Sequence, residues 1–85
     1  MSQVTELTAL GCSAAKYFRL GMEAAGSEDL TRFIDDLFPL LGSLPAETIS
    51  HLNEISMAVL GAQARRDFLQ VADLLQYKIA PLLNG

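Results

Sequence analysis

Few residues of this chain have types and spacing that could do chemistry, and the clearest group stands on one predicted helix. The single histidine, His51, lies one helical turn from Glu47 and from Glu54, so the three side chains could point at a common ion. One imidazole and two carboxylates from one exposed helix leave a coordination sphere open, and no second histidine is present to close it. The pattern therefore favours a solvated strip of charges over a metal site.

A second candidate pairs Cys12, as a nucleophile, with His51 as its base. A catalytic cysteine needs an oriented base and an oxyanion pocket, whereas Cys12 stands mid-helix among Gly, Ser and Ala, where cysteine packs as a small hydrophobe. Asp35 and Asp36 are adjacent and point about 100° apart on a helix, so they cannot share a proton. Because the sequence also lacks a phosphate loop, a Ser–His–Asp set and a nucleotide fingerprint, we predict no enzymatic activity and no cofactor.

Composition and charge narrow the class of partner. The chain carries a formal net charge of -4, and its basic residues are scattered except for Arg65 and Arg66, which argues against nucleic acid and against a cationic membrane-surface helix. We expect no secretory signal in the first residues and no membrane span, since no apolar run approaches about 18 residues. A single cysteine cannot form an internal disulfide, so the sequence favours a cytoplasmic protein.

The elements that must position these residues are helices, because apolar residues recur at threes and fours and no alternation of period two competes. We expect residues 1–85 to form one all-α domain, a small bundle of about four helices arranged as hairpins. The predicted helices cover residues 3–25, 28 to about 41, 45 to near 65, and 67 to about 83. One continuous helix over residues 46–80 is the alternative for the last two.

The apolar stripes of the second and third predicted helices indicate which residues face the core. In the second helix we expect burial of Leu30, Phe33, Ile34, Leu37, Phe38 and Leu41. In the third we expect an inward face of Ile49, Leu52, Ser56, Val59, Leu60 and Gln63.

Glycine and serine residues in the first half of the chain predict helix caps and close contacts between helices. Gly26 suits a left-handed cap at the end of the first helix, and Ser27 suits the N-cap of the second. Gly11 and Gly21 fall inside the first predicted helix, where glycine costs roughly 1 kcal/mol relative to alanine. We therefore expect another backbone to come close at these two positions.

Two sequence signals predict where the second helix ends and where the third and fourth helices separate. Pro39 removes a backbone hydrogen bond, so it should kink the second helix outward or end it near Phe38. Asp67 and Gln70 have the spacing of a capping box, in which Asp67 accepts from the N–H of Gln70 and the Gln70 side chain reaches back. This spacing favours a break near Arg65.

The predicted apolar surface exceeds what one small core can cover. The chain is 51% hydrophobic, and one of this size hides only about 60% of its unfolded surface, so we expect dimerisation to complete or stabilise the bundle. Apolar or aromatic residues that flank the main stripes are the predicted interface with a second copy or a client helix. These residues are Leu20, Met57, Leu69, Leu74 and Tyr77.

The C-terminal part resembles a group of known proteins. Residues 72–82 carry an A-D-L-L-x-Y-x-x-x-P-L pattern, and the stretch 52–83 resembles short bacterial all-helical proteins of uncharacterised families. Lys78 stands where such proteins often have an acidic residue after the tyrosine. The resemblance implies a companion of motility or secretion systems, and it implies no activity.

These observations lead to one functional hypothesis and its alternatives. We predict a small cytoplasmic helical interaction module that acts as an adaptor or an export-chaperone-like binder of a helical client. The alternatives are a regulator that binds an enzyme or a transcription factor directly, and a metal-binding protein that uses Glu47, His51 and Glu54. The identity of the client and the choice between two and four copies stay open.

Overall fold

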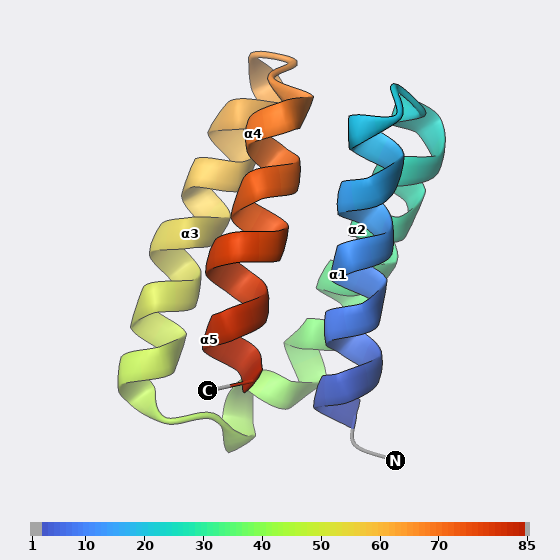
Figure 1. Cartoon of the computed structure of the whole chain (residues 1–85). Helices are drawn as coiled ribbons and strands as arrows, with labels where there is room; N and C mark the ends of the chain where they lie inside the picture. The colour runs from blue at the N-terminus through green and yellow to red at the C-terminus, as the bar shows by residue number, and fades with distance from the viewer. Residues whose placement is uncertain (1–2, 85) are drawn as a thin grey trace.

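The computed structural model describes residues 3–84, and all the regular structure in this range is helical. Helix α1 covers Gln3–Arg19, α2 covers Glu23–Leu37 and α3 covers Ala46–Ala64. A fourth rod consists of α4 (Phe68–Asp73), the π-helix η2 (Leu74–Ile79) and α5 (Ala80–Asn84), placed end to end. The predicted all-α fold with about four helices in hairpins is confirmed (Figure 1).

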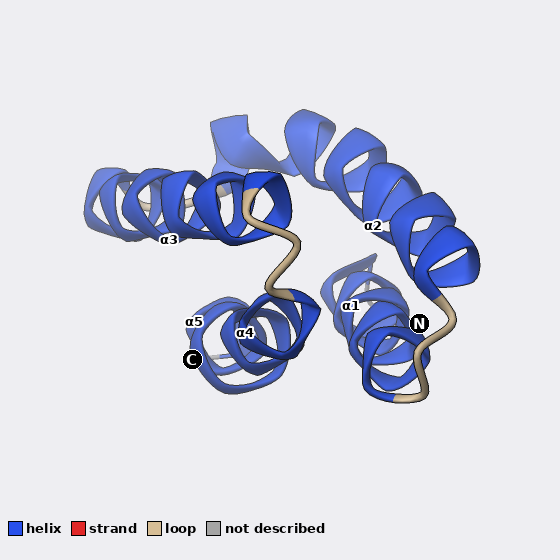
Figure 2. Ribbon diagram, turned by 90° about the horizontal axis from the view of Figure 1, so that it is seen from above, coloured by secondary structure: helices blue, strands red, loops and turns tan. Residues whose placement is uncertain are grey.

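The four rods do not form a closed ring. Helix α1 packs against α2 on one side and against α4, η2 and α5 on the other, while α3 packs against α4 and η2. Seen from above, α3 and α2 lie along one side of the molecule, and the fourth rod and α1 lie along the other (Figure 2). Within the described range, no helix has the length and apolar character that crossing a membrane requires.

The turn between α1 and α2 lies earlier than the sequence predicts, because Gly21 ends the first helix and Gly26 does not. Gly21 has a φ of 77°. Its N–H donates to the carbonyl of Phe18 at 3.1 Å, and the N–H of Met22 donates to the carbonyl of Tyr17 at 2.9 Å. This is a Schellman motif, which needs a left-handed residue after the last helical turn. A Cβ on Gly21 would meet nothing within 4 Å, so the predicted close approach there is wrong.

Gly26 instead lies inside α2, where it allows two helices to pack closely. A Cβ at this position would be 2.8 Å from Cδ1 of Phe18, closer than two carbon atoms can pack. Ser27, the predicted N-cap, also lies within α2 and caps no helix. Close packing is present at Gly11, as predicted, but the neighbour is the ring of Phe33, 3.0 Å from a built Cβ, and not a backbone.

The predicted break between the third and fourth helices is confirmed, and the continuous helix over residues 46–80 is wrong. Arg66 has a φ of 59° and takes the same place in a Schellman motif that Gly21 takes after α1. Asp67 is the N-cap of α4 and accepts from the N–H of Gln70 at 3.2 Å. The second half of the predicted capping box is wrong, because the Gln70 side chain accepts from Arg65 at 3.0 Å.

The π-helix in the fourth rod is a feature that the sequence did not suggest. The N–H of Ala80 donates to the carbonyl of Leu75, five residues earlier instead of four. Pro81 follows directly, and in a regular α-helix its ring would clash with the carbonyl of Tyr77. The wider π turn relieves this clash and lets the rod continue to residue 84.

The core sits around α1 and the fourth rod. The rings of Phe18 and Phe68 stack with their centroids 5.3 Å apart and their planes 5° from parallel. Among the described residues no polar or charged side chain is buried. The largest fully buried side chains are Leu52, Val71 and Leu75.

Candidate functional site

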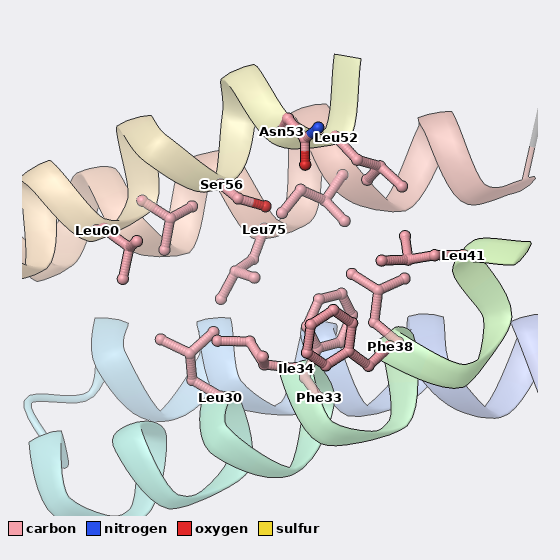
Figure 3. A pocket seen from close by; sticks show the side chains of 13 residues that line it. Leu30, Phe33, Ile34, Phe38, Leu41, Leu52, Asn53, Ser56, Leu60 and Leu75 are labelled. Carbon is pink, nitrogen blue, oxygen red and sulfur yellow. The ribbon is translucent and has the colours of Figure 1, made fainter. Parts of the chain in front are cut away.

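An apolar groove of about 210 Å³ runs between α2 and α3 (Figure 3). Leu75 and Ile79 of η2 form its floor. Its walls come from α2, from the 3-10 helix η1 (Phe38–Ser43) that joins α2 to α3, and from α3. The wall residues are Leu30, Phe33, Ile34, Leu37, Phe38, Leu41, Leu52, Asn53, Ser56, Val59 and Leu60.

Large apolar side chains stand exposed along this groove. Ile34 is 44% exposed, Phe38 is 73% exposed and Leu60 is 58% exposed. The sequence analysis placed all three in the core, and that prediction is wrong. Helical periodicity identifies the apolar face of a helix, but it does not say whether another element covers the whole of that face.

The width of the apolar face on α2 explains why its outer part stays uncovered. Leu30, Phe33 and Leu37 are buried, whereas Ile34 and Phe38 each stand about 100° further round the helix than the residue before them. The buried part packs on α1, as the contact between the ring of Phe33 and Gly11 shows. The outer part therefore faces α3 across the groove.

Pro39 sets the junction between α2 and η1. Helix α2 ends at Leu37, directly before Phe38, as the sequence predicted from Pro39. The chain continues as the 3-10 helix η1, so Phe38 and Leu41 line the end of the groove where the chain crosses from one wall to the other (Figure 3).

Two polar side chains lie on the α3 wall. Asn53 is exposed and Ser56 is half-buried, and both point into the groove (Figure 3). Among the described lining residues they are the ones that can form hydrogen bonds with their side chains. The groove therefore offers a large apolar surface and two polar contacts on one wall.

Charge is distributed unevenly along the chain. Seven of the ten acidic residues but one of the six basic residues lie between positions 23 and 64, the stretch that contains both walls. This stretch carries a formal charge of -6, so the rest of the chain carries +2 of the total of -4. The acidic residues of the stretch are Glu23, Glu28, Asp29, Asp35, Asp36, Glu47 and Glu54, and its basic residue is Arg32.

The interface residues predicted from the sequence lie outside the groove lining. Four of them are exposed, by 62% to 74%, and Leu74 is half-buried. Met57 follows the groove residue Ser56, and Tyr77 lies under the guanidinium of Arg19, 5.6 Å from the ring centroid. The four exposed residues are Leu20, Met57, Leu69 and Tyr77.

Arg19 of α1 also contacts two polar side chains of the fourth rod. Its Nη2 lies 2.7 Å from Oδ1 of Asp73, and its Nη1 donates to the side chain of Gln76. These contacts connect α1 to the fourth rod at the surface. Asp73 is therefore occupied within the chain.

The candidate metal and nucleophile residues do not converge. Glu47, His51 and Glu54 are exposed on α3, and no group of three or more His, Cys, Asp or Glu residues within the described range could hold a metal ion. Cys12 is half-buried with a free thiol.

No known family, curated protein or solved structure matches this chain. The resemblance of residues 52–83 to short bacterial helical proteins therefore stays a prediction. The groove itself, with its exposed apolar side chains, is the feature from which a function can be argued.

Proposed function

We propose that this protein is an interaction module, an adaptor or export-chaperone-like binder, that takes an amphipathic helix of a client protein into the groove between α2 and α3. The observation that carries the proposal is an apolar floor between two apolar walls, with Ile34, Phe38 and Leu60 left exposed. Exposed apolar residues gathered in one groove are a recurrent feature of sites that bind helices. A cytoplasmic setting is part of the proposal and is supported by the free thiol of Cys12.

The dimensions of the groove support a short helical occupant. Its α2 and η1 wall extends from Leu30 to Leu41, which corresponds to about 16 Å, or roughly three turns of helix. A helix of this length presents apolar anchors at positions i, i+4 and i+7. An apolar cavity of roughly 150 Å³ already takes a benzene molecule, so a groove of about 210 Å³ has room for a Leu or Phe side chain.

The expected affinity is moderate. Burying a Leu or Phe side chain fully contributes about 1.5–3 kcal/mol, and part of this gain is offset by the loss of rotational and translational freedom on association. We expect dissociation constants in the micromolar range for an isolated helix. The same groove would serve a regulator that binds a helix of an enzyme or a transcription factor.

Self-association through a second surface stays a prediction. Leu20, Leu69 and Tyr77 are exposed and lie outside the groove lining, so dimerisation would not need the groove. Light scattering on the purified protein measures this directly. A monomeric mass at tens of micromolar would contradict the predicted dimer and leave the groove proposal intact.

A matched pair of variants tests the groove. Leu60 and Leu69 are exposed to similar extents, 58% and 63%, but only Leu60 lines the groove. We expect Leu60→Asp to weaken binding of an uncharged Leu/Gln amphipathic peptide about tenfold or more, since a bound helix would bury the new carboxylate. We expect Leu69→Asp to leave binding unchanged.

Fluorescence anisotropy of the labelled peptide measures both affinities, and circular dichroism verifies that both variants stay helical. Equal affinities for wild type and Leu60→Asp would show that the groove is not the binding site. A loss confined to Leu69→Asp would move the site to the fourth rod. Absence of binding to the wild type would remove the proposed function.

A further inference from the structure

The groove and its α3 edge form one face of the molecule on which large apolar side chains stay exposed. Ile34, Phe38 and Leu60 line the groove and are exposed by 44%, 73% and 58%. Met57, exposed by 74%, extends this face outward, because it stands one helical turn from both Asn53 and Leu60 on the surface of α3. We call the surface that carries Ile34, Phe38, Met57 and Leu60 the groove face.

The groove face is large enough for an interface between two copies of the chain. Large apolar side chains carry on the order of 200 Å² each, so the exposed fractions of the four residues correspond to roughly 500 Å² per copy. Patches of about 300–600 Å² are the largest that monomers usually expose. A biological interface buries at least about 1,000 Å² over both partners, which the four residues of two copies supply together. Partly exposed lining residues, among them Leu41 and Ser56, add to this area.

Charged side chains do not oppose the approach of a second copy to this face. Glu47 and Glu54 stand about 160–180° round α3 from the lining residue Ser56, so they point away from the groove. On α2, Asp35 stands about 100° round the helix from the lining residue Ile34. The centre of the groove face is therefore uncharged, as the centres of interfaces between identical subunits usually are.

The exposed apolar residues of the fourth rod form a less suitable face. Leu69 and Tyr77 lie about two helical turns apart, and Asp73 stands between them at equal spacing. Asp73 pairs with Arg19 at 2.7 Å, and the guanidinium of Arg19 lies over the ring of Tyr77. A second copy docked on this stripe would remove an ion pair from water, which is costly. None of the ion pairs between described residues involves the groove face.

We propose that a second copy of this chain covers the groove in the free protein, through a two-fold interface between the groove faces of the two copies. In such an interface the same patch is used on both sides, so the exposed side chains of each copy cover the groove of the other. A groove of about 210 Å³ has room for one of them, such as Leu60 or Phe38. The inference goes beyond the proposed function, because it concerns the protein without a client. It makes the second copy and a client helix competitors for one surface.

The mass of the 85-residue chain in solution is the first test. We expect sedimentation equilibrium at tens of micromolar to give twice the mass of one chain, since a two-fold contact closes after two copies. A monomer over the whole of that range would overturn the inference and leave the groove to a client helix. A mass that keeps rising with concentration would also overturn it, because continued growth requires an open head-to-tail contact.

The matched pair Leu60 and Leu69 locates the interface. We expect Leu60→Asp to raise the dissociation constant of the dimer about a hundredfold or more, because two-fold symmetry buries the new carboxylate twice. Leu69→Asp should leave the dimer unchanged. Both residues are exposed, and circular dichroism verifies that both variants stay helical. A dimer that Leu69→Asp dissociates and Leu60→Asp preserves would overturn the inference and place the interface on the fourth rod.

Met57 distinguishes a second copy from a client helix. It belongs to the groove face but does not line the groove, so a short helix in the groove leaves it uncovered, whereas a second copy buries it. We expect Met57→Asp to weaken dimerisation about tenfold or more without reducing the affinity for the uncharged Leu/Gln peptide. Unchanged dimerisation of this variant would contradict the proposed interface.

Competition between the peptide and the second copy separates this inference from the proposed function. If both proposals hold, the Leu/Gln peptide converts the dimer into a monomer with one bound peptide, and Leu60→Asp weakens both contacts. Peptide binding to a dimer that stays intact would overturn the inference, since the groove would then be open in the dimer. A dimer that Leu60→Asp dissociates but that takes up no peptide would keep the second copy as the occupant and remove the proposed function.

Discussion

Helix α1 meets the fourth rod in a closed contact, whereas α2 meets α3 across an open groove, and both contacts are rich in apolar residues. In the closed contact, Phe18 and Phe68 stack, and the helices contribute completely buried alanines such as Ala15 and Ala72. Arg19 then seals the outer edge through Asp73 and Gln76. In the groove, large side chains stand on both walls and no third element fills the space between them.

The comparison indicates that two properties decide whether two apolar helix faces pack closely. They are the size of the side chains between the helices and the polar contacts at the edge of the interface. Small residues let two helix backbones approach, and the remaining space is filled by a ring stack. Large apolar residues line both walls of the groove between α2 and α3, and Ile34, Phe38 and Leu60 stay exposed there. The first contact therefore holds the fold together, and the second leaves large apolar side chains exposed.

The largest expected difference between the two contacts comes from two phenylalanines. Phe18 is 2% exposed in the closed contact, and Phe38 is 73% exposed at the groove. We expect Phe18→Ala to lower the free energy of unfolding by about 3–5 kcal/mol, and Phe38→Ala to change it by less than about 0.5 kcal/mol. Urea denaturation followed by circular dichroism measures both. Similar losses in the two variants would mean that the groove also supports the fold.

A smaller effect is expected from two glycines that differ in what surrounds them. Gly26→Ala places a Cβ 2.8 Å from the ring of Phe18, which is held by its stack on Phe68, so we expect a loss of about 1–2 kcal/mol despite the better helix propensity of alanine. Gly42→Ala meets nothing within 4 Å and should leave stability unchanged within about 0.5 kcal/mol. Thermal unfolding of the two variants checks the difference. Equal melting temperatures would contradict the close packing of α1 on α2.

The smallest effects are expected at the turns that follow α1 and α3. Both turns have the same backbone motif, but the left-handed residue is Gly21 in the first and Arg66 in the second. Gly21→Ala forces a Cβ into a left-handed conformation and should cost about 1 kcal/mol. Arg66→Gly should be neutral or stabilise by up to about 0.5 kcal/mol, because relief of the left-handed strain is partly offset by loss of the ion pair with Glu23. Arg66→Ala, which loses the pair and keeps the strain, is the control and should be the less stable of the two. A more stable Arg66→Ala would contradict the assignment of strain to this turn.

Local signals predicted the fold class and the later breaks because they depend on few residues. Pro39 ends α2 through its missing N–H, and Asp67 caps α4 through its own side chain. The end of α1 was misplaced because Gly21 and Gly26 look alike in the sequence. Gly21 forms a turn and Gly26 forms a packing contact. This difference depends on how α2 packs on α1, where the ring of Phe18 lies against Gly26 and no atom lies near Gly21.

The groove was missed for a related reason. Ile34 and Leu60 belong to continuous apolar stripes, and periodicity assigned those stripes to the core without asking how much of each the neighbouring helices could cover. Two signals in the sequence pointed to it. The apolar face of α2 is wider than one packing contact needs, and Asn53 and Ser56 place polar groups beside the inward face of α3. The π-helix had no such signal beyond Pro81.

The connection η1 gives the groove two unlike ends. Phe38 and Leu41 stand at the end that the chain crosses, while the other end lies toward the tips of the two hairpins (Figure 1). A docked helix would therefore meet a stop on one side and could extend freely on the other. We expect a natural client to offer a terminal helix or one that breaks sharply, and the protein to recognise the direction of that segment as well as its composition.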